Sequence, residues 1–287
     1  MQAIAADVYI ETAYPGVTLG VIRRPQGLLL IDAPLSLEGA RAWRAALMNL
    51  GGGPDRLLIN LDAHPDRTIG TRAMDCTVIA HERTAQIFRN RPLTFKAGAE
   101  ETGAEWEMGN ALPNIRWAPP ELSFTRHLKI YWDDLPVLVE HHPGPASGAC
   151  WVIVPDSQVV FVGDAVIAGQ PPFLASANIP LWLEALNLLL TSPYQAYQIV
   201  SGRGGVVSSE AVREQIACLT RIYRLLEEQA RQKPSSTALE EVVKACLEDF
   251  PARSAEQQRQ YLQRLRHGLT RYYHRHYHTS SATAEEE

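Results

Sequence analysis

Four residues near position 64 have the types and spacing of a metal or acid–base site. Asp62, His64 and Asp66 alternate directly after the apolar segment 57–59, and Arg67 follows. Carboxylate oxygen and imidazole nitrogen are ligands of divalent ions such as zinc. A guanidinium cannot be a ligand, because it stays protonated and has no free electron pair. Taken alone, the pattern also fits a histidine that makes ordinary structural hydrogen bonds.

Further segments along the chain make a chance pattern improbable. An apolar strand ends in Asp32, Val-Gly-Asp closes a second at Asp164, and Gly-Arg-Gly surrounds Arg203. With the segment around His64, these segments resemble the ordered motifs of the metallo-β-lactamase superfamily. The segments that carry the resemblance are 28–32, 60–70, 137–145, 159–164 and 199–204. The resemblance covers roughly the first 205 residues.

The resemblance also identifies which metal ligands of the family are changed. Four positions where the family has histidine carry another residue: Asp62, Arg67, Pro145 and Arg203. Three family residues are retained: His64, Asp66 and Asp164. An intact two-zinc site is therefore not expected.

Two arrangements of this altered site remain open. In the first, one ion (zinc, manganese or iron) binds to Asp62, His64 and Asp164, with His142 as a further ligand, and arginines replace the second metal. In the second arrangement no metal binds, and Arg67 and Arg203 form salt bridges with the aspartates. No organic cofactor is expected in either.

Each arrangement implies a function. With one ion the resemblance implies a hydrolase for a small anionic ester, phosphate or thioester. In that hydrolase, Asp66 orients or deprotonates the attacking water, and Arg67 and Arg203 stabilise an oxyanion. Without metal, the chain is an inactive relative that binds a small anionic ligand or serves in protein interaction. The fold alone does not choose between them, and from the family resemblance we take the hydrolase as the expected class, with the inactive relative as the alternative.

The expected architecture positions these residues at strand ends. The resemblance implies an α/β fold, a four-layer αβ/βα sandwich with two mixed β-sheets, over residues 1–205. Apolar residues at helical spacing then predict a C-terminal helical extension over 206–278. Capping patterns at Thr237 and Ser254 predict two of its helix starts. Residues 279–287 are small, polar and acidic, which predicts a disordered tail.

Two segments are expected to border the pocket. Residues 100–120, which include Trp106, form a predicted loop or lid. The apolar segment 168–175 follows Asp164, and its Phe173 either contacts the substrate or only packs. Apolar spacing predicts a helix over 40–48, and the helix that Pro180 begins is expected to cover the sheet.

Composition excludes several classes of protein. A chain of 287 residues with 46% hydrophobic and 21% charged residues is typical of a globular protein. The net charge of −5 argues against nucleic-acid binding, and no apolar run is long enough for a membrane span. The N-terminus lacks a secretory signal pattern, and four widely spaced cysteines indicate reduced thiols, so we expect a cytoplasmic protein. The C-terminal helices are expected to pack on the main domain or form a homodimer.

Overall fold

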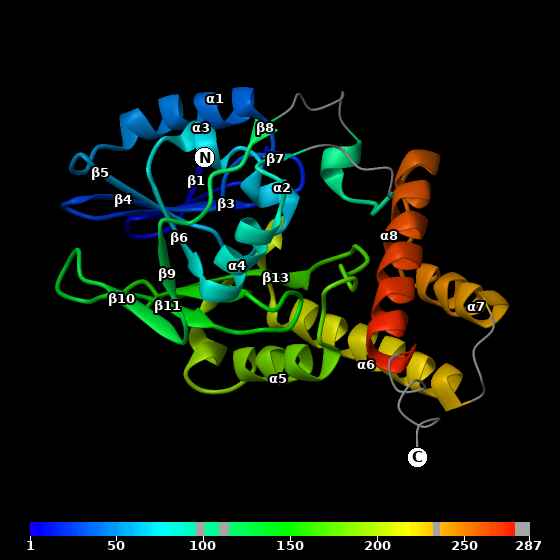
Figure 1. The fold of residues 1–287 in the computed structure, drawn as a ribbon. Coiled ribbons are helices and arrows are strands. Elements are labelled where there is room, and N and C mark those ends of the chain that lie inside the picture. The colour runs from blue at the N-terminus through cyan, green and yellow to red at the C-terminus, as the bar shows by residue number, and fades with distance from the viewer. Residues whose placement is uncertain (96–100, 109–114, 232–235, 279–287) are drawn as a thin grey trace, which may run out of the picture.

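Two mixed β-sheets pack face to face, and helices cover both outer faces (Figure 1). The computed structural model describes residues 1–95, 101–108, 115–231 and 236–278. The first sheet has the strand order β1-β2-β3-β4-β5-β6-β9, and the second has the order β10-β11-β12-β13-β14-β15. The predicted four-layer αβ/βα sandwich with C-terminal helices is confirmed.

The first sheet is antiparallel in its first part and parallel in its second. Its strands are β1 (Gln2–Ala5), β2 (Val8–Glu11), β3 (Leu19–Arg23), β4 (Gly27–Ile31), β5 (Asp55–Ile59), β6 (Thr77–His81) and β9 (Leu122–Phe124). The pairs from β1 to β4 are antiparallel, whereas β4, β5, β6 and β9 are parallel. The carboxyl ends of β4 and β5 therefore lie side by side, which brings Asp32 next to the loop after Ile59.

The second sheet contains one parallel pair. Its strands are β10 (His127–Ile130), β11 (Val137–His141), β12 (Cys150–Val154), β13 (Val159–Ile167), β14 (Gln198–Arg203) and β15 (Gly205–Val207). Only β13 and β14 are parallel, with Phe161 opposite Val200 and Gly163 opposite Ser201. This pairing places the ends of the two strands, with Asp164 and Arg203, at the same edge. A separate two-stranded sheet joins β7 (Thr94–Phe95) and β8 (Ile115–Arg116).

Buried aliphatic side chains of both sheets form the central core. Ile22, Ile59, Val139 and Phe161 belong to this cluster, and each is at most 2% exposed. Each contributes the face of its strand that points away from the helices. Burial of this kind contributes about 25 cal/mol for each Å² of apolar surface removed from water.

Four helices follow strands of the first sheet: α1 (Leu37–Leu47), α2 (Pro65–Thr68), α3 (Thr71–Met74) and α4 (Glu82–Asn90). Buried residues of α1 and α3 pack on the outer face of this sheet. Helix α4 instead packs against the loops that follow the strands, and its Thr84 hydroxyl donates to Gly148 O in the loop before β12. In α1, Ala40, Trp43 and Leu47 are buried, as their spacing predicts. The helix begins three residues before the predicted start at Ala40, because the Ser36 hydroxyl accepts a hydrogen bond from Gly39 N at 2.9 Å.

The second sheet is covered by α5 (Ile179–Leu189), α6 (Ser209–Arg231), α7 (Ser236–Leu247) and α8 (Ala255–Tyr273). Buried residues of all four helices belong to one core with β12, β13 and β14. The predicted cap at Ser254 begins α8, where its hydroxyl accepts from Gln257 N at 3.1 Å. Figure 1 shows α8 standing across one end of the sandwich. The predicted disordered tail lies outside the described residues.

Short helical turns complete the chain: η1 (Met48–Leu50), η2 (Glu105–Glu107), η3 (Tyr194–Ala196) and η4 (His274–His278). None of the helices in the described segments has the length and apolar character that a membrane span requires.

Candidate functional site

The loop after β5 brings the first candidate residues together. His64 ends the loop and caps α2, with Nδ1 accepting from Asp66 N at 3.3 Å. Asp62 Oδ1 accepts from His64 N at 2.7 Å. Pro65 at the first helical position suits this start, since its ring fixes a helical φ and it has no N–H to satisfy. The loop is therefore held by its own polar side chains.

Arg67 is fully buried among three carboxylates. Nη1 donates to Asp32 Oδ2 at 2.7 Å, and Nη2 donates to Asp164 Oδ1. Nε lies 3.0 Å from Asp62 Oδ1, as an ion pair without hydrogen-bond alignment. Asp32 reaches its position with a left-handed backbone (φ 59°), and its Oδ1 accepts from Leu61 N at 3.0 Å. One guanidinium thus joins the ends of β4, β5 and β13.

Arg203 forms a second buried centre next to the first. Its Nε and Nη2 lie 3.2 and 3.3 Å from the two oxygens of Asp164. Its Nη1 donates to Asp66 Oδ2 at 3.0 Å and to Glu105 Oε2. Gly202 makes the close approach of these strands feasible, since a Cβ there would lie 2.7 Å from Asp164 Oδ1. Asp164 therefore binds both guanidinium groups.

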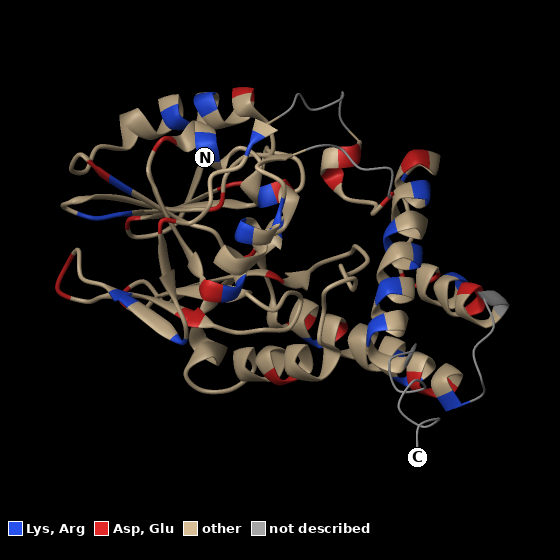
Figure 2. Ribbon diagram, in the orientation of Figure 1, with Lys and Arg blue, Asp and Glu red and all other residues tan. Residues whose placement is uncertain are grey.

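A third guanidinium comes from the C-terminal helix α8. Arg264, which is 1% exposed, donates from Nη2 to Glu105 Oε1 at 2.9 Å and from Nε to Gly103 O at 3.0 Å. The ring of Phe173 packs against two of the arginines, with its centroid 4.1 Å from Cζ of Arg264 and 4.4 Å from Cζ of Arg203. Figure 2 shows several basic residues along α8. One basic residue of this helix, Arg264, is buried and forms an ion pair inside the protein.

The guanidinium groups set the protonation of the carboxylates near them. Burial favours the neutral form of Glu105, but Arg203 and Arg264 outweigh it and lower the pKa of Glu105 to about 2. Burial likewise opposes ionisation of Asp164, and Arg203 and Arg67 hold its pKa below the ordinary value. Both groups are ionised at neutral pH.

Burial outweighs the nearby guanidinium groups at the other three carboxyl groups, Asp32, Asp62 and Asp66, and raises the pKa of each. It raises the pKa of Asp66 to about 7 despite the nearby Arg203, and the pKa of Asp32 to about 6 despite Arg67. Burial and Arg203 also lower the pKa of His64 well below its usual value, so this imidazole is neutral at pH 7. Five carboxyl groups and three guanidinium groups would leave a formal charge of −2 if all were ionised, and a proton on Asp66 reduces it.

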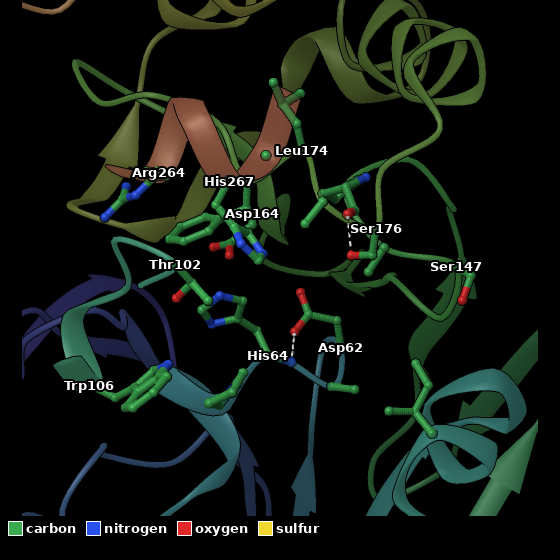
Figure 3. A pocket seen from close by; sticks show the side chains of 18 of the residues that line it. Asp62, His64, Thr102, Trp106, Ser147, Asp164, Leu174, Ser176, Arg264 and His267 are labelled. Atoms are coloured by element: carbon green, nitrogen blue, oxygen red, sulfur yellow. Dashed lines mark hydrogen bonds between the residues drawn. The ribbon is translucent and has the colours of Figure 1, made fainter. Parts of the chain in front are cut away.

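A cavity of about 390 Å³ opens above this charged network. Figure 3 shows Asp62 on one side of the cavity and Arg264 and His267 of α8 on the other, with His64 and Asp164 drawn between them. Much of the lining is apolar and includes Ile87, Trp106, Pro145, Phe173 and Leu174. The described part of the predicted 100–120 loop supplies Thr102 and Trp106, and the ring of Phe173 lies 4.5 Å from that of His64.

The structure places the sequence-predicted residues in two groups. Asp62, His64 and Asp164 line the cavity. Asp66, Arg67 and Arg203 are not among its lining residues, and their ion pairs enclose them. None of these three is positioned to touch a bound ligand directly.

His142 lies away from the site. Its ring stacks on Trp151 at 3.8 Å between centroids, and its Nε2 lies 3.2 Å from Glu140 Oε2. It follows β11, whose extended backbone sends alternate side chains to opposite faces, and His141 on the other face contacts Ser147 O at 2.9 Å. Neither histidine lines the cavity above Asp62 and Asp164.

The donor set does not fit the divalent ions that the fold family implies. Asp62, Asp66 and Asp164 each face a guanidinium, so the oxygens that would bind an ion already neutralise fixed positive charge. In the described segments, no group of three or more His, Cys, Asp or Glu residues is arranged to hold a metal. An ion placed among these residues would meet the unfavourable charge of Arg67 or Arg203.

The raised pKa of Asp66 predicts an unusual pH dependence of stability. Between pH 4 and 7 the folded chain keeps a proton on Asp66 that the unfolded chain, with a pKa near 3.8, releases. This group therefore lowers the free energy of unfolding as the pH rises, by at most about 1.4 kcal/mol per pH unit. In Asp66→Asn this contribution is absent. Urea unfolding at pH 5, 6, 7 and 8 should therefore show that the free energy of unfolding of the wild type falls, relative to that of the variant, as the pH rises.

Asp55→Asn, which changes an exposed carboxylate, is the control. Its difference from the wild type should be the same at each pH. If the free energies of unfolding of Asp66→Asn and the wild type differed by the same amount at every pH, Asp66 would not be protonated in the folded chain over this range.

Comparison with known proteins agrees with this architecture. Residues 70–199 match the sequence profile described as "Metallo-beta-lactamase superfamily". The matched segment includes Asp164 but begins just after Arg67, and so leaves out the altered loop. No curated protein sequence matches the chain.

Solved structures extend the likeness in fold. A metallo-β-lactamase from Pontibacter korlensis is 17% identical, with a TM-score of 0.61, 76% of this chain and 97% of that chain covered. The DIM-1 metallo-β-lactamase is 15% identical, with a TM-score of 0.59 and coverage of 77% and 96%. A double mutant of the sec-alkyl sulfatase PisA1 is 15% identical with a TM-score of 0.66, and it covers 98% of this chain but 51% of its own.

These likenesses establish the fold and not the activity. The chain has the metallo-β-lactamase fold, which it shares with hydrolases, and the resemblance predicted from the sequence is confirmed. The match to the sulfatase also extends over the C-terminal helices, although this chain spans only about half of that protein.

Proposed function

We propose that this chain is a metallo-β-lactamase-fold protein that binds a small molecule without a metal ion. The observation that carries the proposal is the double use of Asp164, whose oxygens bind Arg67 and Arg203 at once. A metal-dependent hydrolase needs such carboxylates for its ions. In this chain guanidinium groups take that electrostatic role, which favours the inactive relative over the one-metal hydrolase.

The lining of the cavity favours a mainly apolar ligand with one polar end. The apolar part would lie against Trp106, Phe173 and Leu174, and the polar end would face Asp62 or Asp164. A volume of about 390 Å³ falls within the range of roughly 300–1,000 Å³ that is usual for small-molecule sites.

The anionic ligand expected from the sequence would need a different arginine. Arg67 and Arg203 lie beneath the cavity, but Arg91 lines it. Nη2 of Arg91 donates to Ala63 O at 2.8 Å, and its buried Nη1 has no hydrogen-bond partner in the described part of the chain. If the ligand carries a carboxylate, Nη1 of Arg91 is the donor that would bind it.

One observation favours the hydrolase as a second candidate. Asp62, His64 and Asp164 all line the cavity, and a neutral imidazole is the form in which histidine binds a metal. In that case one ion would bind to these residues and displace part of the arginine network.

Metal analysis distinguishes the two candidates. We expect untagged protein purified without chelator to hold well under one equivalent of zinc, manganese or iron, even after incubation with each ion. Its melting temperature should be the same in EDTA and in added metal. One equivalent of bound ion that is lost in Asp62→Ala/His64→Ala would instead establish the hydrolase candidate.

A cavity-filling variant tests the ligand site separately. Ala175→Trp should weaken binding of the apolar probe 1-anilinonaphthalene-8-sulfonate at least fivefold, because the indole would occupy the cavity that Ala175 lines. Ala46→Trp, at a half-buried position on α1, is the matched control. Equal probe affinity in both variants would contradict this ligand site.

A further inference from the structure

A second, smaller cavity of about 260 Å³ lies beside the first. Its walls come from the start of α4, the end of β11, the segment before α5 and η4, which follows α8. The two cavities share Ala146, Ser147 and Ser176 in their walls, but the second contains none of the acidic residues of the first. It is therefore a separate chemical environment.

The charged side chains around this second cavity are all basic. Arg83 belongs to α4 and Arg275 to η4, and two imidazoles, His141 and His276, complete the set. No described lining residue is acidic. Burial lowers the pKa of both imidazoles below the ordinary value. The neighbouring Arg275 lowers the pKa of His276 further. The positive charge at neutral pH therefore comes from the two guanidinium groups.

The two arginines differ in how they are held. Arg275 is fixed, because Nη2 donates to Ala177 O and Cζ lies 5.9 Å from the centroid of the Tyr272 ring. The guanidinium of Arg83 is exposed and makes no ion pair with any described residue. One cation is thus preorganised, and the other is available to close on a ligand.

Helix α5 adds a third source of positive potential. Its N-cap Asn178 and its first-turn residue Leu181 line the same cavity. The N-terminus of an eleven-residue helix carries roughly half a positive charge. The N–H of Leu181 is already bound to Asn178 Oδ1 at 3.1 Å, so this end acts through its dipole.

We propose that this cavity binds an oxyanion: phosphate, sulfate or carboxylate, free or as the end group of a larger molecule. Guanidinium groups match the geometry of oxyanions with paired N–H donors, and a helix N-terminus favours negative charge. Three elements that are distant in sequence supply this charge, and no described lining residue neutralises it. The proposal for this site does not depend on whether the first cavity binds a metal ion or on which ligand it binds.

Titration with inorganic phosphate, sulfate and a simple phosphate monoester tests this site. In calorimetry at low ionic strength, we expect millimolar or tighter binding of at least one of them. Arg83→Gln and Arg275→Gln should each weaken it at least fivefold. Both residues are exposed, and a thermal melt of each variant checks that its folding is unchanged. Arg89→Gln, an exposed arginine on the same helix as Arg83, is the matched control and should bind as the wild type.

The pattern of binding identifies the source of the anion. Binding of inorganic ions shows that a free oxyanion suffices, whereas binding of the ester alone assigns the site to an end group. Equal affinity in all three variants, or no binding of any probe to the wild type, would overturn the proposal. Neither outcome depends on the result with the probe of the first cavity.

Discussion

Replacing Arg67 by methionine is expected to lower the free energy of unfolding by about 3–5 kcal/mol, the usual cost of removing one partner from a buried ion pair. Methionine preserves much of the volume but leaves Asp32, Asp62 and Asp164 without their shared guanidinium. Because a whole domain is stable by only about 5–15 kcal/mol, the variant should be marginal. Urea unfolding followed by circular dichroism measures the loss.

Arg72→Met is the matched control, because Arg72 is an exposed arginine a few residues further on. It should change the free energy of unfolding by less than about 0.5 kcal/mol. If Arg67→Met cost as little as this control, the buried network would not contribute to stability.

A double-mutant cycle keeps this prediction testable if Arg67→Met folds poorly. Asp32→Asn retains the acceptor for Leu61 N, and asparagine tolerates the left-handed backbone at this position. In Arg67→Met/Asp32→Asn, one of the uncompensated charges is gone. We therefore expect the double variant to be more stable than Arg67→Met, with a coupling energy of roughly 1–3 kcal/mol. A double variant that is less stable than Arg67→Met would contradict the pairing.

Why could the fold be predicted from the sequence? Its polar motifs lie at or near the carboxyl ends of apolar strands: Asp62 follows β5, Asp164 lies in the last part of β13, and Arg203 ends β14. The order of such strand-end motifs is set by chain connectivity, and the apolar spacing of Trp43 or Leu219 directly reflects the face that packs. The order of the motifs and the apolar spacing can both be seen in short stretches of sequence. They are therefore still present in this chain, although several residues at the metal-ligand positions of the family differ.

The partners of the site depend on tertiary contacts that leave no local signal. Arg264 appeared in the sequence as one of several basic residues on a helix with an apolar stripe, yet it meets Glu105 across 159 positions. Glu105 lies in the predicted loop or lid over 100–120, and the sequence indicates Asp32 only as the end of a strand motif. The sequence also could not show that Arg67 and Arg203 lie beneath the cavity, because that depends on the depth of packing.

The charge balance explains why three guanidinium groups are needed. Two divalent ions would bring four positive charges, whereas Arg67 and Arg203 bring two. Asp62 adds a negative charge where the family resemblance implies a neutral histidine. Glu105 adds a further negative charge, which Arg264 offsets, and the raised pKa of Asp66 removes part of the remaining negative charge. The altered loop and the C-terminal helix thus form one electrostatic unit.

The second large effect that we expect is a loss of stability when Arg264 is removed from this electrostatic unit. Arg264→Met should lower the free energy of unfolding by about 3 kcal/mol, because Glu105 loses one of its two guanidinium partners in a buried setting. Arg264→Lys should lose less, since it keeps the charge but not the second hydrogen bond to Gly103 O. Urea unfolding of both variants beside Arg259→Met, an exposed arginine on the same helix, measures the difference.

The same variants separate packing from electrostatics. Methionine keeps an apolar contact with Phe173, so a purely packing role for Arg264 would leave Arg264→Met close to the control. An electrostatic role predicts that its deficit is smaller at pH 4 than at pH 8. With one guanidinium removed, the pKa of Glu105 rises from about 2, so that protonation relieves the buried charge at low pH. A deficit that is equal at the two pH values would assign α8 a packing role alone.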